Sequence, residues 1–258
     1  MKELIIFDLD GTLNASKMPP DKEMADLLCK LLAKTKVAVM SGASFAQFEK
    51  QLLKNLGCSS NELSRLFLMP TSGGSLYRYE QNSWVQKYKN SFSKKDIDKI
   101  RQAFELAITD TNIASPDTIY GELIEDRDSQ VTYSPLGQEA PIELKEKWDP
   151  DHNKAHRIVS ALIDYIPEFE VRIGGGTSID ITKKGIDKAY GIQKIRESLK
   201  INQENMLFIG DATFPEGNDY SVKKAGIEMI QVSGPEETKK IIHELLKTRV
   251  PESKIPKG

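Results

Sequence analysis

The sequence predicts an α/β protein in which a doubly wound parallel sheet is interrupted by an inserted α+β domain. Short apolar runs alternate with segments of helical period at both ends of the chain. That alternation is lost between residues 82 and 183, where a charged helix accompanies several short segments of period two. We therefore expect a core formed by residues 1–81 and 184–258, with an inserted domain formed by residues 82–183.

The first half of the core reads as alternating strands and helices. Residues 4–7 form an apolar run that ends at Asp8, which is typical of a buried parallel strand. A helical pattern runs from residue 21 to 32, and residues 37–40 predict a second strand that ends at Ser41. A helix over 45–56, a strand over 66–69 and a short strand over 75–77 after a glycine turn complete this half.

The inserted domain is expected to combine two helices with a small antiparallel sheet. The helices are predicted over 94–108 and 154–166, and the strands over 120–124, 130–133, 170–173 and 178–181. A helix over 189–199, a strand over 206–209 that leads to Asp211, and a last strand over 227–230 then restore the parallel sheet. Residues 248–258 predict a frayed tail.

The overall charge and the cysteine content limit the function classes. The chain has 36 basic and 38 acidic residues, and its net charge of -2 does not indicate a basic surface for nucleic acid or a membrane. A small-molecule partner is therefore expected. Cys29 lies among leucines in a helical pattern, which predicts a free, buried thiol and no disulfide framework. No signal peptide or membrane span is evident, so the cytoplasm is the expected location.

Polar side chains follow three of the predicted strands. Asp8 and Asp10 come after the first strand, Ser41 after the second and Asp211 after the strand over 206–209. Each of them alone would be an ordinary cap or turn residue. Because ligands of open parallel sheets bind outside the carboxyl ends of the strands, their coincidence indicates one functional site.

The residues Asp8-Leu9-Asp10-Gly11-Thr12 match the DxDGT signature, and the chain resembles the haloacid dehalogenase (HAD) superfamily. Further motifs of that family follow in order at Ser41, at Lys188 and at Gly210-Asp211 leading to Asp219. The resemblance implies a Rossmann-like core with a cap domain. It also implies Mg²⁺-dependent phosphoryl transfer through an aspartyl phosphate.

The resemblance assigns roles to the motif residues. Asp8 would be the nucleophile, Asp10 the general acid and base, and Lys188, favoured by the pattern over Lys184, the compensating cation. The expected Mg²⁺ ligands are Asp8, the backbone carbonyl of Asp10 and Asp211, with Asp219 supporting the metal or the lysine. The expected phosphate-binding groups are the backbone amides of Leu9, Gly11 and Gly42, the hydroxyls of Thr12 and Ser41, and Asn218.

Within the superfamily, the chain resembles the branch that holds sugar phosphatases and eukaryotic-type phosphomannomutases. The stretch over 210–219 and the segment with Ser178 and Asp180, which would contact sugar hydroxyls, are similar to those of the mutases. Arg127 stands where the mutases carry an arginine for the distal phosphate, but Gln138 stands where a second arginine is expected. Arg172 could supply the missing charge.

These departures favour hydrolysis of a phosphorylated hexose. The second motif, Ser41-Gly42-Ala43-Ser44, also resembles that of a phosphatase. The close alternative is a phosphomannomutase that interconverts mannose 6-phosphate and mannose 1-phosphate, and a remote one is a non-catalytic sugar-phosphate binding protein. The resemblance to the mutases further implies a homodimer through the cap.

Overall fold

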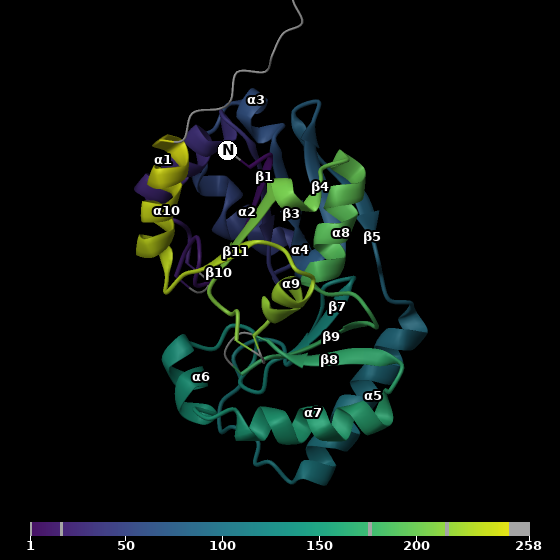
Figure 1. The fold of residues 1–258 in the computed structure, drawn as a ribbon. Coiled ribbons are helices and arrows are strands. Elements are labelled where there is room, and N and C mark those ends of the chain that lie inside the picture. Colours follow the sequence, from purple (N-terminus) through teal and green to yellow (C-terminus); the bar gives the residue numbers. More distant parts are fainter. Residues whose placement is uncertain (1, 16–17, 175–176, 215–216, 248–258) are drawn as a thin grey trace, which may run out of the picture.

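The computed structural model describes residues 2–15, 18–174, 177–214 and 217–247, and it confirms the predicted fold class. Two lobes are visible in Figure 1, the core above and the cap below. The predicted tail over 248–258 lies outside the described residues. The strands of the core are β1 (Leu4–Asp8), β2 (Lys36–Met40), β3 (Leu66–Met69), β4 (Ser75–Glu80), β5 (Ser83–Lys89), β10 (Met206–Gly210) and β11 (Met229–Gln231).

The core sheet has the order β11-β10-β1-β2-β3-β4-β5 and is parallel except for β4 and β5. Alternate side chains of its strands point to opposite faces of the sheet. Ile5 and Phe7 therefore pack against one helical layer, and Leu4 and Ile6 pack against the other. The first layer contains α1 (Lys22–Leu32), α2 (Phe45–Gln51), η1 (Leu53–Asn55), α3 (Ser60–Leu63) and α10 (Pro235–Lys247). The remaining core elements are α4 (Pro70–Gly73), α8 (Lys188–Leu199), η2 (Gln203–Asn205) and α9 (Tyr220–Lys224).

Strand β5 corrects the predicted start of the inserted domain at residue 82. It pairs with β4 in the core sheet. The turn between the two strands contains Gln81 and Asn82, and both residues have a positive φ. The strand escaped prediction because it lies at an exposed sheet edge and lacks an apolar run. The last core strand also begins two residues later than predicted, at Met229.

The cap is a four-stranded antiparallel sheet covered on one face by two helices (Figure 1). Val131, Ile181 and their neighbours pack against those helices, whereas Gln130, Thr132 and Asp180 lie on the opposite face. The strand predicted over 120–124 is displaced to Ile124–Asp126, because Gly121 with a φ of +75° breaks the extended backbone before it. The cap elements are α5 (Lys94–Thr111), β6 (Ile124–Asp126), β7 (Gln130–Tyr133), α6 (Ile142–Trp148), α7 (Asn153–Tyr165), β8 (Phe169–Ile173) and β9 (Ile179–Lys183), in the sheet order β6-β7-β9-β8.

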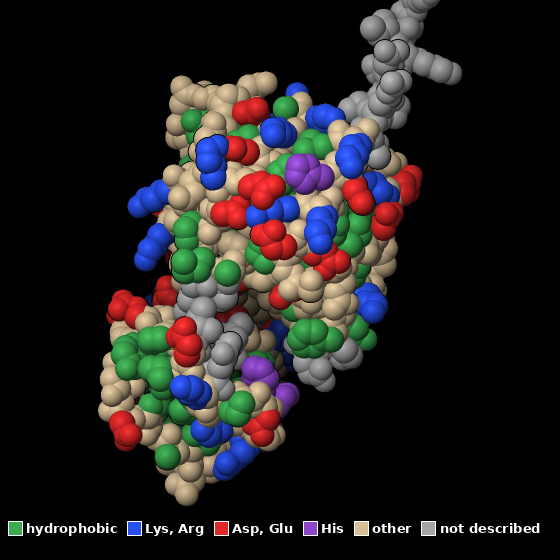
Figure 2. Space-filling model, turned by 90° about the vertical axis from the view of Figure 1, so that its left-hand side faces the viewer, with side chains coloured by type: hydrophobic (Ala, Val, Ile, Leu, Met, Phe, Trp, Pro, Cys, Tyr) green, Lys and Arg blue, Asp and Glu red, His purple; other side chains and the backbone are tan. Residues whose placement is uncertain are grey.

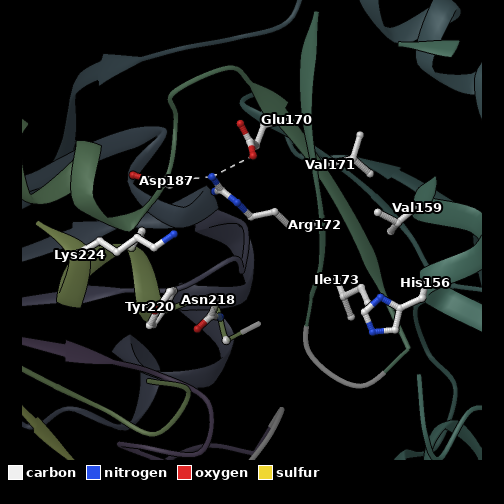
Figure 3. A pocket seen from close by; sticks show the side chains of 12 residues that line it. His156, Val159, Glu170, Val171, Arg172, Ile173, Asp187, Asn218, Tyr220 and Lys224 are labelled. Atoms are coloured by element: carbon white, nitrogen blue, oxygen red, sulfur yellow. Dashed lines mark ion pairs between the residues drawn. The ribbon is translucent and has the colours of Figure 1, made fainter. Parts of the chain in front are cut away.

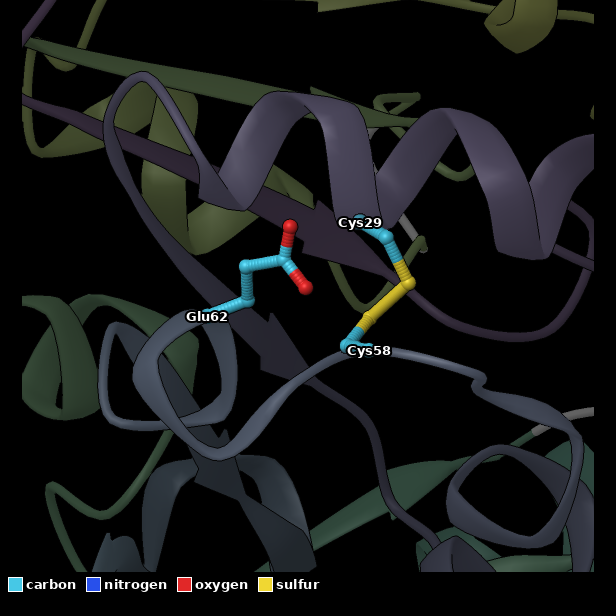
Figure 4. Close-up of side chains that lie close together, drawn as sticks. All are labelled: Cys29, Cys58 and Glu62. Atoms are coloured by element: carbon cyan, nitrogen blue, oxygen red, sulfur yellow. A yellow bond between two sulfur atoms is a disulfide. The ribbon is translucent and has the colours of Figure 1, made fainter.

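The prediction of a free Cys29 thiol is wrong, because Cys29 forms a disulfide with Cys58 (Figure 4). The bond joins α1 to the loop before α3, and both cysteines are partly exposed. The helical pattern around Cys29 predicts a buried side chain, which is only partly buried in the structure, and it contains no information about a partner 29 residues away. No helix among the described residues is long and apolar enough to cross a membrane.

Substituting Cys58 by serine is expected to lower the free energy of unfolding by about 3 kcal/mol, because the cross-link restricts the unfolded chain. For a protein of this size, that loss corresponds to a fall of roughly 6–12 °C in the melting temperature. Calorimetry with and without dithiothreitol checks this prediction. Reductant should shift the wild type to the value of the variant and leave the variant unchanged; an equal melting temperature for both proteins without reductant would contradict the stabilising role.

Candidate active site

Lys188 reaches Asp8 from a different part of the chain. It is the first residue of α8, follows the N-cap residue Asp187, and is about 1% exposed. Its Nζ donates to Asp8 Oδ1 at 2.5 Å and to Asp219 Oδ1 at 2.6 Å. It also donates to Asn218 Oδ1 at 3.2 Å. The lysine and the two motifs predicted to meet are therefore in contact, whereas Lys184 is exposed.

Asp211 completes the cluster from the end of β10. One oxygen each of Asp8, Asp211 and Asp219 can be chosen so that all three lie within 4.8 Å of one another. The Thr12 hydroxyl donates to Asp211 Oδ1 at 3.4 Å, so Thr12 supports this carboxylate. Gly11 has a φ of +78°, and a Cβ on it would lie 2.5 Å from Asp211 Oδ2. Only glycine allows the loop after β1 to approach Asp211 so closely.

The charges of this cluster fit a divalent cation. Three carboxylates face the single ammonium group of Lys188, so the buried site has an excess of two negative charges when all are ionised. Burial and the neighbouring carboxylates raise the pKa of Asp8 and of Asp211. Burial lowers the pKa of Lys188, but the adjacent carboxylates together outweigh this effect, raise the pKa and keep the lysine charged. A hard cation with oxygen ligands would balance the excess.

Asp219 is arranged to hold Lys188. Its Oδ1 accepts from the lysine, and its Oδ2 accepts from the backbone N–H of Ala212 at 3.1 Å. The side chain is completely buried. Of the two roles expected for Asp219, support of the lysine is the one with a direct contact.

The second motif forms a buried loop after β2. Ser41 is 4% exposed, and its Oγ accepts from the backbone N–H of Ala43 at 3.1 Å. Thr71 and Ser72, after β3, have φ values of 53° and 55° and donate backbone hydrogen bonds to Ala43 and Ser41. Such a backbone conformation is unfavourable for residues other than glycine and is frequent at functional sites. The same strand-end rule, applied to residues 66–69, could have found Thr71 and Ser72 from the sequence.

The cap residues Arg127 and Gln138 lie together at the boundary with the core. Arg127 Nη1 donates to the Gly42 carbonyl at 2.9 Å, and its Nη2 donates to Gln138 Oε1 at 3.2 Å. Its guanidinium also forms an ion pair with Glu125 at 2.6 Å. The positive charge that is expected to bind a distal phosphate is thus present, but it is already paired with a carboxylate.

Ser178 and Asp180 also lie together, near the second motif. A Cβ on Gly174 would lie 2.6 Å from both Ser178 Oγ and Asp180 Oδ2, so both atoms lie next to Gly174. Burial raises the pKa of Asp180, and the charge of Arg127 opposes this shift. The two residues predicted to contact sugar hydroxyls therefore meet on the cap face that is turned to the core.

Arg172 does not join Arg127. It lies on the edge strand β8, and its Nη2 pairs with Glu170 at 3.3 Å and with Asp187 at 3.5 Å (Figure 3). It lines a cavity of about 380 Å³ between the cap and α9, which Asn218 also borders. Figure 2 shows that the surface is hollowed between the two lobes. Arg172 thus bridges the cap to the residue before Lys188 rather than filling the place of the missing arginine.

Comparison with known proteins identifies the family to which the chain belongs. The family described as "Eukaryotic phosphomannomutase" matches residues 24–248. Phosphomannomutase 2 of Dictyostelium discoideum is 27% identical over 226 residues, covering 85% of this chain and 86% of that protein. The phosphomannomutase of Saccharomyces cerevisiae is 26% identical over 251 residues, covering 94% and 93%.

Solved structures share the fold at lower identity. The IMP-bound, N-terminally truncated IMP-nucleotidase of Plasmodium falciparum superposes with a TM-score of 0.69 at 19% identity, over 96% of this chain and 68% of that one. A haloacid dehalogenase-like hydrolase of Bacteroides thetaiotaomicron gives 0.62 at 15% identity, over 95% and 100%. The predicted HAD resemblance and the prediction of an enzyme are confirmed. The chain is a HAD-type phosphotransfer enzyme that belongs to the eukaryotic phosphomannomutase family.

Proposed function

We propose that this protein is a phosphomannomutase that interconverts mannose 6-phosphate and mannose 1-phosphate. The observation that carries the proposal is the contact of Lys188 with Asp8 and Asp219 beneath a cap that presents Asp180 to the core. Family membership supports the mutase over the hydrolysis that the sequence favours. The differences at Ser41 and Gln138 change groups around the substrate but leave Asp8, Asp10 and Lys188 unchanged.

The reaction proceeds in two transfers. In the first, an oxygen of Asp8 attacks phosphorus, the bond from phosphorus to the leaving oxygen breaks, and Asp10 donates a proton to that oxygen. In the second, Asp10 removes the proton of the accepting sugar hydroxyl, whose oxygen attacks phosphorus as the bond to Asp8 breaks. Lys188 stays protonated and stabilises the charge on the phosphoryl oxygens. A hexose bisphosphate supplies the first phosphoryl group.

The phosphate and sugar are held by groups around this centre. We assign the phosphoryl oxygens to the backbone amides of the DxDGT loop and of Gly42, to the Ser41 hydroxyl and to Asn218. The sugar hydroxyls belong to Ser178 and Asp180, and the distal phosphate to Arg127 with Gln138. The cap-mediated homodimer stays a prediction, which light scattering after gel filtration would check.

Mg²⁺ is the proposed cofactor, held by Asp8, the Asp10 carbonyl and Asp211. When bound, it would neutralise charge on the transferred phosphoryl group. Chelation by EDTA is expected to lower the rate by about 10³-fold, with recovery on addition of Mg²⁺. Asp211→Asn should raise the Mg²⁺ concentration for half-maximal rate by about tenfold or more. Full activity of the wild type in EDTA after extensive dialysis would contradict this assignment.

The products distinguish mutase from phosphatase. The protein is incubated with Mg²⁺ and mannose 1-phosphate, with and without a hexose bisphosphate, while mannose 6-phosphate and free phosphate are both measured. The proposal expects mannose 6-phosphate as the main product and a rate that rises with the bisphosphate. Release of free phosphate alone would overturn the mutase and favour sugar-phosphate hydrolysis.

A further inference from the structure

Gln130 is buried in the cap yet directs its amide at the core. The side chain is 0% exposed, and its Nε2 donates to the Gly42 carbonyl at 3.1 Å and to Thr132 Oγ1 at 3.0 Å. A backbone carbonyl only accepts hydrogen bonds, so the NH₂ group must be the end of the amide that faces Gly42. The two donors of the amide are therefore used, one across the domain boundary and one within the cap.

Thr132 extends this contact to Asp180. Its hydroxyl accepts from Gln130 and donates its single proton to Asp180 Oδ1 at 2.8 Å. On β7, Gln130 and Thr132 are two residues apart and share a face, and Thr132 lies opposite Asp180 on β9. The other oxygen of Asp180 lies 3.5 Å from the position of a Cβ on Gly42. A hydrogen-bond chain thus links the core carbonyl to the Asp180 carboxylate, with Gln130 donating toward both ends.

This buried amide is an unfavourable choice for packing alone. Gln130 Oε1 is buried and has no hydrogen-bond partner among the residues that the structure describes. A methionine of similar length would fill the same space without burying an unsatisfied acceptor. The two donated hydrogen bonds are the compensating gain, which points to a role for them in the site. Burial raises the pKa of Asp180, and the charge of Arg127 opposes this shift, followed by the hydrogen bonds of Thr132 and Gln130.

We propose that Gln130 and Thr132 are positioning residues that couple closure of the cap on Gly42 to the orientation of Asp180, and thereby direct the phosphoryl group to a sugar hydroxyl rather than to water. The inference rests on the proposed mutase function. When the cap lifts away from Gly42, Gln130 loses its core acceptor and Thr132 loses a fixed donor. Asp180 is therefore held in the orientation for the sugar only in the closed state, in which water is excluded.

Three variants of the whole chain test the inference. Thr132→Val removes the hydroxyl at nearly constant shape, and Thr132→Ser keeps it; Gln130→Met removes both donors at nearly constant length, and the wild type is its reference. The measurement is the ratio of free phosphate to mannose 6-phosphate formed from mannose 1-phosphate with a hexose bisphosphate. We expect Thr132→Val and Gln130→Met to raise this ratio by about tenfold, and Thr132→Ser to retain the wild-type ratio within about twofold.

The outcomes separate this inference from the function on which it rests. If the wild type makes mannose 6-phosphate and the variants lose both products in proportion, the residues are only structural and the inference is wrong. It is also wrong if Thr132→Ser behaves like Thr132→Val, because the hydroxyl then has no role. If the wild type releases only free phosphate, the mutase proposal itself fails, and the inference falls with it.

Discussion

Replacing Asp8 by asparagine is expected to lower kcat by about 10⁴-fold or more, because an uncharged amide cannot accept the phosphoryl group. The folded protein should retain or gain stability. Burial raises the pKa of Asp8, so the ionised carboxylate at neutral pH costs folding free energy, and a neutral isostere removes that cost. Steady-state kinetics on mannose 1-phosphate and a thermal melt of the same preparation check both parts.

The melt is the control for the kinetic result. A variant that is inactive and unfolded would reveal nothing about the nucleophile, whereas an inactive variant that melts at or above the wild-type temperature supports the assignment. Turnover within about tenfold of the wild type would exclude Asp8 as the acceptor.

Replacing Lys188 by methionine is expected to lower kcat by about 10³-fold, since the ammonium group that contacts Asp8 would be lost from the site. The same change leaves the buried carboxylates of Asp8 and Asp219 without their cation. We expect a loss of about 3–5 kcal/mol in the free energy of unfolding when Mg²⁺ is absent. Urea unfolding with EDTA and with Mg²⁺ measures the loss and its partial recovery by the metal.

Lys184→Met is the matched control, because it removes the same charge from an exposed position four residues earlier. It should change kcat by less than about twofold and leave the unfolding free energy within about 0.5 kcal/mol. Equal losses in the two variants would mean that general electrostatics, rather than the contacts of Lys188, explain the effect.

The meeting of Asp8 and Asp211 could be predicted from the sequence, because it follows from the strand order. Asp8 ends β1 and Asp211 follows β10, two neighbouring parallel strands whose carboxyl ends meet at one edge of the sheet. Lys188 depended on the family pattern, since its spacing to Lys184 alone does not say which lysine turns inward. Lys188 lies in the first turn of α8, and this position explains why Lys188 rather than Lys184 turns inward.

Features that depend on how two lobes or two distant segments meet could not be predicted. Gln130 and Thr132 read as polar positions of an ordinary strand, and only the docked cap shows that they face Gly42. Cys58 has no local pattern that names Cys29 as its partner. Strand β5 is polar because it lies at a sheet edge, so its sequence resembles the charged inserted domain more than the buried core.

Direct detection of the phosphorylated residue tests the account most directly. The wild type is mixed with Mg²⁺ and ³²P-labelled hexose bisphosphate, quenched in acid within milliseconds, and digested at low pH for peptide mapping. The account predicts alkali-labile label on the peptide that contains Asp8, formed at least as fast as turnover and absent from Asp8→Asn. Turnover by a protein that carries no label, or label on a peptide without Asp8, would contradict it.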